Sequence, residues 1–146
     1  MQVNKKKFIY IFIFFFIFFL DRISKIIVIN KTEKIVDNTI FESSFINLEL
    51  IWNKGIAFGL FSFNESLIYN IITSIIMIIS IVIILMIIQS KGFKKLSLLF
   101  VFGGSMGNLF DRIYYSAVPD FIDLHINNYH WFVFNVADIF ITFGII

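Results

Sequence analysis

The sequence predicts an all-α polytopic membrane protein with four transmembrane helices and a small extracytoplasmic β-sheet. Two observations lead to this fold class. The 146 residues are 59% hydrophobic and 15% charged, whereas an ordinary soluble domain is about 45–50% apolar and about 25% charged. The hydrophobic residues also fall into four separate stretches, and a soluble fold of this composition would expose a large apolar surface. We expect one membrane-embedded domain that covers residues 1–146.

The first expected helix covers about residues 8–29. It begins with an uninterrupted apolar run at 8–20, directly after Lys5–Lys7, and the apolar character resumes beyond Asp21–Lys25. A basic start before an apolar run is also typical of a secretory signal peptide. No small-x-small cleavage site follows here, so an uncleaved transmembrane helix is the better interpretation.

Three further helices are expected at about 67–88, 96–115 and 131–146. The stretch 67–88 has no charged residue and is long enough for a bilayer, which needs about 20 helical residues. The last stretch is short, because its helix would extend about 24 Å in a hydrocarbon core of about 30 Å. We therefore expect that this helix ends early or that the chain is truncated at Ile146.

The positions of the lysines predict the orientation in the membrane. Lys5–Lys7 precede the first helix, and three more lysines lie between the second and third helices, within 91–95. The segment 30–66, by contrast, holds three Lys against five acids. Because Lys and Arg are retained on the cytoplasmic side, we expect both termini in the cytoplasm and the segments 30–66 and 116–130 outside.

The outer segment 30–66 has the period of a β-strand rather than that of a helix. Apolar residues alternate with polar ones over most of 46–53, as in a strand with one buried face. Asn53–Gly55 then predict a turn, and a second apolar stretch follows at 56–63. The simplest account is a small sheet on the outer surface of the membrane.

Polar side chains inside the expected helices share one depth. At 1.5 Å per helical residue, the following residues all fall in the outer third of the membrane: Asp21, Lys25, Asn108, Asp111, Arg112, Asn135 and Asp138. Ionisable groups in a bilayer are costly and mark functional sites. Asp21 and Lys25 have the spacing of a helical ion pair. Arg112 either neutralises Asp111 or reaches the membrane surface.

Asp120 and Asp138 are the strongest candidates for a catalytic pair. Asp120 lies in an apolar loop, and no Lys or Arg follows Asp138 in the chain. Seventeen residues separate the two acids, enough for a loop to leave the third helix and return to the fourth. Two acids in a partly dry site do not both ionise easily, so one holds a proton. The pair then supplies a base and an acid for hydrolysis, as in aspartic proteases.

Three other interpretations carry less weight. Gly103–Gly107 match the G-x-S-x-G pattern of serine hydrolases, with Ser105 as the nucleophile, but in the middle of a helix they favour close helix packing. His125 and His130 lack the spacing of metal ligands, so neither a metal nor another cofactor is expected. A proton relay for a transporter would cross the whole membrane, and the inner two-thirds of the expected helices hold no ionisable residue.

Cysteine content and net charge exclude further classes of protein. A chain without Cys has no disulfide, no thiolate nucleophile and no zinc–thiolate site. The formal charge of +2 is too small to indicate a nucleic-acid partner. The aromatic belt at a membrane interface is a sufficient explanation for Trp52 and Trp131.

Five blocks of the sequence resemble the lipoprotein signal peptidase (signal peptidase II) family, in order and in spacing, over nearly the whole chain. The blocks are Asp21-x-x-x-Lys25, Asn53-Lys54-Gly55-Ile56-Ala57-Phe58-Gly59, Gly103-Gly104-x-x-Gly107-Asn108-x-x-Asp111-Arg112, Val118-x-Asp120-Phe121 and Phe134-Asn135-x-Ala137-Asp138. Each block alone is a weak signal, but five in order are highly specific. Two positions depart from the family pattern, with Arg22 where Gln is usual and Ser116 where Gly is common.

The resemblance implies an aspartic endopeptidase of the bacterial cytoplasmic (inner) membrane, without a cofactor. Its substrates would be diacylglyceryl-modified prolipoproteins, cut just before the lipidated Cys, with membrane lipids around the enzyme. The catalytic pair of the family corresponds to Asp120 and Asp138. Its supporting and substrate-binding positions correspond to Asp21, Lys25, Asn53, Gly55, Asn108, Asp111, Arg112 and Asn135. We expect a monomer with its active site toward the outer face and no nucleic-acid partner.

Overall fold

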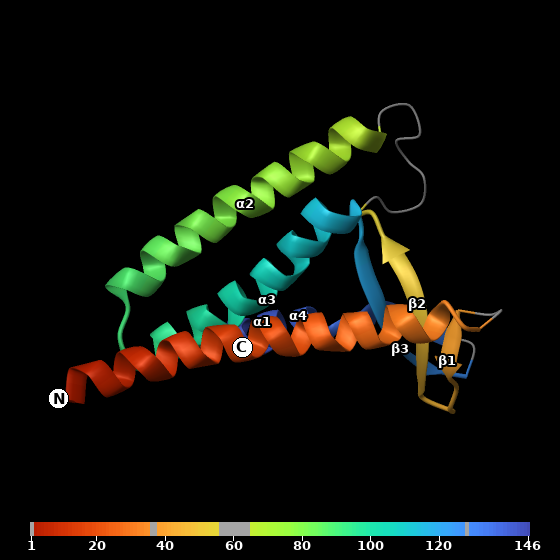
Figure 1. Cartoon of the computed structure of the whole chain (residues 1–146), viewed down its shortest axis with the longest axis horizontal. Coiled ribbons are helices and arrows are strands. Elements are labelled where there is room, and N and C mark those ends of the chain that lie inside the picture. Colours follow the sequence, from red (N-terminus) through yellow and green to blue (C-terminus); the bar gives the residue numbers. More distant parts are fainter. Residues whose placement is uncertain (1, 36–37, 56–64, 128) are drawn as a thin grey trace.

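The computed structural model describes residues 2–35, 38–55, 65–127 and 129–146, which form four helices and one sheet (Figure 1). In chain order the elements are α1 (Gln2–Thr32), β1 (Thr39–Phe41), β2 (Ile46–Asn53), α2 (Glu65–Gln89), α3 (Gly92–Tyr115), β3 (Val118–Ile126), β4 (Tyr129–Phe134) and α4 (Val136–Ile145). Four helices with a small sheet are what the sequence predicts. The apolar stretch at 56–63 lies outside the described residues.

The four strands form one sheet in the order β1-β2-β3-β4, and each neighbouring pair is antiparallel. The sheet lies at the end of the molecule where α1 ends, far from the N-terminus (Figure 1). The strand predicted at 46–53 is confirmed as β2. The sheet is larger than predicted, because β3 and β4 supply half of its strands.

The chain between α3 and α4 corrects two predictions. The expected loop at 116–130 contains β3, which pairs along β2. The helix expected at 131–146 begins only at Val136, because Tyr129–Phe134 form β4. Aromatic and β-branched residues such as those of β4 favour a strand, and pairing with β3 satisfies its backbone N–H and C=O groups. A short apolar run fits a helix or a strand equally well, so pairing with a neighbour decides between them.

Helix α3 lies at the centre of the helical part and contacts α1, α2 and α4. Glycines allow these helices to approach closely. A Cβ on Gly104 would collide with the backbone carbonyl of Ala137 in α4, and one on Gly107 would lie 2.5 Å from Asp21 Oδ2 in α1. The stretch that holds Ser105 is therefore a packing face inside a helix, as predicted, and not the strand-to-helix turn of a nucleophilic serine.

Large apolar side chains cover the outside of the helices. Phe8, Phe12 and Ile88, for example, are 70%, 68% and 69% exposed. Among the described helices, α2 over Leu67–Gln89 is the one that is both long and apolar enough to cross a membrane. The apolar part of α1 is bounded by ionisable residues, and α4 is short.

Two features of the described residues connect the sheet to the helices near the start of β3. Val28 of α1, Leu50 of β2 and Phe121 of β3 form a buried apolar cluster. Helix α3 ends at Tyr115, its C-cap Ser116 has a left-handed φ of 56°, and β3 begins at Val118. Glycine adopts this conformation without strain, which is a physical reason why Gly suits this position in the family that the sequence resembles. These two attachments fix the start of β3, where Asp120 lies.

Candidate active site

One asparagine joins Asp120 to Asp138. Asn135 lies between β4 and α4 and is fully buried. Its side-chain amide donates a hydrogen bond to Asp120 Oδ1 at 2.6 Å. Its backbone N–H donates a second one to Asp138 Oδ2 at 3.1 Å. The structure thus brings the two acids of the predicted pair into one site.

The first turn of α4 explains how Asp138 is oriented. Asn135 is the N-cap of this helix, and its Oδ1 accepts the backbone N–H of Asp138 at 3.2 Å. Asp138 in turn accepts the backbone N–H of the N-cap, which completes a capping box. The partial positive charge at a helix N-terminus also favours a carboxylate here. Local helix chemistry therefore holds the Asp138 side chain in place.

Each of the two carboxylates accepts one more hydrogen bond from a side-chain amide. Asn53 at the end of β2 donates to Asp120 Oδ2 at 2.8 Å. Asn108 of α3 donates to Asp138 Oδ1 at 2.8 Å. All four carboxylate oxygens of the pair therefore have an N–H donor, and these donors come from β2, α3 and the segment before α4.

A buried lysine behind Asp138 orients the Asn108 amide. Lys25 Nζ donates to Asn108 Oδ1 at 2.8 Å and to Asp111 Oδ2 at 2.6 Å. It also pairs with Asp21 at 2.9 Å, which confirms the predicted ion pair. Because the ammonium occupies the Asn108 carbonyl oxygen, the NH₂ group of this amide is turned toward Asp138. The ion pair on α1 is thus linked to the candidate site.

Arg22 completes the buried network, although sequence reasoning noted it only as a departure from the family pattern. Its guanidinium pairs with Asp111 and, at 3.2 Å, with Asp21. Two cations, Arg22 and Lys25, therefore face two carboxylates, and the network is neutral. Of the two roles expected for Arg112, the neutralisation of Asp111 is wrong, since Arg22 and Lys25 supply it. The sequence feature that could have revealed this role of Arg22 is a second cation, besides Lys25, within the apolar part of the first helix.

Asp21 also fixes α4 to α1. Its Oδ1 accepts the backbone N–H of Ala137 at 3.0 Å, one of the N–H groups that the first turn of a helix leaves without an internal partner. Asp21, Lys25 and Asp111 are all 0% exposed. The position of the α4 N-terminus, and with it that of Asp138, therefore depends on a charge in α1.

Arg112 lies apart from this network, beside Tyr69 and Gly55. Its guanidinium is 5.7 Å from the centre of the Tyr69 ring, and the Tyr69 hydroxyl donates to the Arg112 carbonyl oxygen at 2.7 Å. Gly55 has a φ of +74°, and a Cβ there would lie 3.1 Å from Arg112 Nη1. Among the described residues, the buried Nε and Nη1 of Arg112 have no hydrogen-bond partner. Such groups are suited to bind a carbonyl oxygen.

An apolar cavity borders Asp138. Its volume is about 290 Å³, and its other lining residues are Leu124, Trp131, Phe132, Phe134, Ile139, Thr142 and Phe143. They come from β3, β4 and α4. The cavity therefore places a half-buried carboxylate next to space for an apolar group, an arrangement typical of small-molecule and peptide sites.

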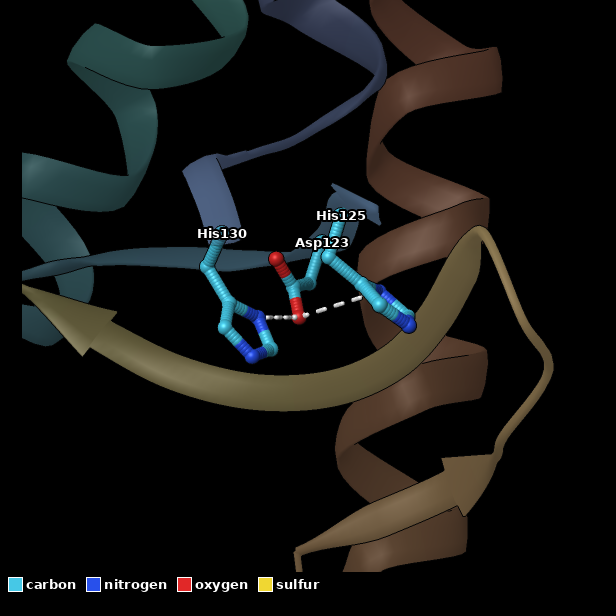
Figure 2. A group of neighbouring side chains, drawn as sticks. All are labelled: Asp123, His125 and His130. Carbon is cyan, nitrogen blue, oxygen red and sulfur yellow. Dashed lines mark hydrogen bonds and ion pairs between the residues drawn. The ribbon is translucent and has the colours of Figure 1, made fainter. Parts of the chain in front are cut away.

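Asp123, His125 and His130 form a second polar cluster, on β3 and β4 (Figure 2). One potential ligand atom of each residue lies within 4.8 Å of those of the others. The sequence analysis expected no metal because the two histidines lack the spacing of metal ligands, but the fold brings both of them to Asp123. Their proximity comes from the hairpin register, in which His130 pairs with His125, and residue spacing along the chain does not reveal that pairing.

Comparison with known families identifies the family of the chain. A family model described as signal peptidase (SPase) II matches residues 13–146. The chain belongs to the signal peptidase II family. This result confirms the resemblance that was drawn from five sequence blocks.

Relatives of this signal peptidase II family member cover most of its length. It is 48% identical to the lipoprotein signal peptidase of Pelagibacter ubique, over 99% of this chain and 87% of the relative. It is 41% identical to the lipoprotein signal peptidase of Anaplasma phagocytophilum, over 97% and 90%. Two solved bacterial membrane enzymes, determined by the in meso method, match 93% of this chain and 82% and 86% of theirs, with TM-scores of 0.69 and 0.70 at 29% and 28% identity.

Burial perturbs the Asp120 carboxyl of this signal peptidase II family member. The residue is 3% exposed, and burial raises its pKa from the ordinary 3.8 to about 6. Hydrogen bonds from Asn53 and Asn135 oppose this rise in pKa, and the charge of Asp138 adds to it. A carboxyl with such a pKa exchanges its proton close to neutral pH, as acid–base chemistry requires.

The free energy of unfolding of the Asp120→Asn variant should depend less on pH than that of the wild type between about pH 4 and about pH 6. In this window the folded wild type keeps a proton on Asp120 that the unfolded chain has released, so its free energy of unfolding falls as the pH rises. Asn does not ionise. As the pH rises through this window, the free energy of unfolding of the variant should increase by up to about 3 kcal/mol relative to that of the wild type. Thermal unfolding in detergent at several pH values measures this difference, and parallel profiles would contradict the raised pKa.

Proposed function

We propose that this protein is a membrane aspartic endopeptidase that removes signal peptides from diacylglyceryl-modified bacterial prolipoproteins, by cleavage just before the lipidated Cys. The observation that carries the proposal is the joining of Asp120 and Asp138 by Asn135 in one site. Membership of the signal peptidase II family supports a protease. The names of the relatives support a lipoprotein precursor as the substrate.

In the proposed mechanism, Asp120 and Asp138 share one proton. The ionised carboxylate takes a proton from water while the water oxygen attacks the scissile carbonyl carbon, and the protonated carboxyl polarises the carbonyl oxygen. The proton taken from water then passes to the amide nitrogen as the C–N bond breaks. The reaction consumes one water molecule and uses no cofactor at the carboxyl pair.

Fixed amide donors support this mechanism. Asn53, Asn108 and Asn135 hold the two carboxylates at donor–acceptor distances of 2.6–2.8 Å. Donors that are already in place need no rearrangement while charge moves between the two acids. Lys25 contributes indirectly through Asn108, because its ammonium donates a hydrogen bond to the Asn108 carbonyl oxygen. We assign Lys25, Asp21 and Asp111 a supporting role.

The surroundings of the pair suit an extended, partly apolar peptide. Arg112 and Gly55 lie together, and the guanidinium offers buried N–H groups that have no partner among the described residues. We assign these two residues to the binding of the substrate backbone. The apolar cavity beside Asp138 accommodates an apolar side chain of the signal peptide.

We also propose a multi-pass arrangement in the cytoplasmic membrane, with both termini in the cytoplasm and the carboxyl pair toward the outer face. Lys95 Nζ lies 5.2 Å from the centre of the Tyr10 ring, so the lysine-rich starts of α1 and α3 lie at the same end. The sheet lies at the opposite end (Figure 1). Positive residues at one end and a sheet at the other fit the positive-inside rule.

Asp120→Asn and Asp138→Asn should each abolish cleavage, because each variant loses one half of the acid–base unit. We expect initial rates at least about 100-fold lower on a lipidated prolipoprotein in detergent. Ser105→Ala, a change of similar size in α3, should keep most of the activity. Strong cleavage by either Asn variant, at matched amounts of folded enzyme, would overturn the mechanism. Complete loss in Ser105→Ala would favour a serine peptidase.

Cysteine labelling in intact cells should reveal the orientation. The chain has no native Cys, so a single introduced Cys gives an unambiguous signal. Glu42, between β1 and β2, and Tyr129, in β4, are both exposed, so Glu42→Cys and Tyr129→Cys should react with a membrane-impermeant thiol reagent from outside. Phe93→Cys, at the 79% exposed start of α3, should react only after the cells are opened. Labelling of position 93 in intact cells would invert the orientation.

A lipidated precursor should be cut much faster than the same peptide without lipid. Each buried methylene contributes about 0.8 kcal/mol to membrane anchoring, so two acyl chains hold the cleavage site at the membrane. Trp52→Ala should reduce the rate less than either aspartate variant, because Trp52 is 42% exposed and packs on Tyr115 outside the carboxyl pair. Initial rates on both precursors in the same detergent test this. Equal rates would point to a general membrane protease.

A further inference from the structure

Asp123, His125 and His130 form a cluster that the proposed peptidase mechanism does not use. Asp123 and His125 lie on β3, and His130 faces them from β4 (Figure 2). Asp123 is three residues from Asp120 on the same strand, so the two side chains project from opposite faces of β3. The cluster is therefore separate from the Asp120–Asp138 pair, although one strand carries both.

The hydrogen bond of His125 defines which ring nitrogen holds its proton. Nε2 lies 3.1 Å from the carbonyl oxygen of Ser43. A carbonyl oxygen only accepts, so Nε2 carries the proton and Nδ1 of the neutral ring presents a lone pair. That lone pair lies 3.8 Å from Asp123 Oδ2, which is also an acceptor. Two electron-rich atoms thus face each other at a distance too long for a hydrogen bond.

The Asp123 carboxylate and the His125 imidazole are both buried, and each has an atom without a hydrogen-bond partner among the described residues. The side chains of Asp123 and His125 are 4% and 8% exposed. Among the described residues, His125 Nδ1 and Asp123 Oδ1 have no hydrogen-bond partner. Asp123 Oδ2 has one partner in the cluster, His130 Nδ1 at 2.7 Å. Buried acceptors without a donor are costly, and a cation between His125 Nδ1 and Asp123 Oδ2 would give the unpartnered imidazole nitrogen a partner.

We propose that Asp123, His125 and His130 bind a divalent transition-metal ion, with Zn²⁺ as the best match. Two imidazoles and one carboxylate are ligands that Zn²⁺ prefers, and three protein ligands leave the fourth tetrahedral position for water. Tetrahedral ligand atoms lie roughly 3.3 Å apart, and the present separations of 2.7 and 3.8 Å lie on either side of that value. His130 is 55% exposed, which gives the ion a path from solvent.

The surroundings of the cluster support a structural metal site. A metal-binding histidine commonly donates its other N–H to a backbone carbonyl, as His125 does to Ser43. A metal ion here would connect β3 to β4 and, through His125, to the turn between β1 and β2. Metal binding at His130 Nδ1 requires the tautomer with the proton on Nε2, so the ion would take the place of the hydrogen bond between His130 Nδ1 and Asp123 Oδ2. The ion would thus stabilise the strand on which Asp120 lies.

The composition of the chain makes this proposal simple to test. His125 and His130 are the two histidines of the chain, and Cys is absent. The full chain is purified in detergent with an affinity tag that lacks His and Cys, treated with a chelator and then titrated with ZnCl₂ by calorimetry. We expect one Zn²⁺ per chain with a dissociation constant of about 1 μM or tighter. Zn²⁺ should also raise the midpoint of thermal unfolding.

His130→Gln is the informative variant, because this half-exposed position tolerates a change better than its buried partners. Its Zn²⁺ affinity should fall at least about 100-fold, and Zn²⁺ should no longer raise its unfolding midpoint. Glu33→Gln, which removes an exposed carboxylate just after α1, is the matched control and should bind like the wild type. Equal affinity in His130→Gln, or no saturable binding by the wild type up to about 1 mM, would overturn the proposal and leave a hydrogen-bonded Asp–His pair.

Discussion

The buried ammonium of Lys25 is the interaction on which the rest of the structure depends. A buried lysine costs several kcal/mol unless its charge is paired and its hydrogen bonds are made. Asp21, Asp111 and Asn108 meet this need with oxygen atoms 2.6–2.9 Å from Nζ. Asp21 is on α1 and the other two are on α3, so the burial of one charge fixes how these helices face each other. Gly107 provides the space for that approach.

Two residues of this network, Asp21 and Asn108, form hydrogen bonds with the first turn of α4. Asp21 holds the backbone of its first turn, and Asn108 holds the Asp138 carboxylate. The sheet brings Asp120 from the other side, because β3 is paired with β2 and packed on α1. The carboxyl pair therefore lies where a helical part and a sheet meet, and each part holds one acid. A site built on rigid elements keeps the acid and the base in a productive geometry.

Sequence reasoning was most reliable where the governing physics is local. Continuous apolar runs predict helices, alternation predicts β2, and the four-residue spacing of Asp21 and Lys25 predicts their ion pair. The expected depths also grouped Asn108, Asp111 and Asp138, and the structure links these residues through hydrogen bonds of Lys25 and Asn108. The local rule failed at residues 131–134, which were expected to be helical and belong to β4, because a short apolar run is compatible with both a helix and a strand.

The sequence by itself therefore determined the kinds of elements, their approximate order and the polar layer that crosses them. Only the tertiary structure decided which groups of that layer are partners. Arg22 and Lys25, not Arg112, neutralise Asp111, and His130 meets Asp123 and His125 across a hairpin. Such choices depend on helix rotation and strand register, which are set by contacts between residues far apart in the chain. The periodicity of a single segment contains no information about those contacts.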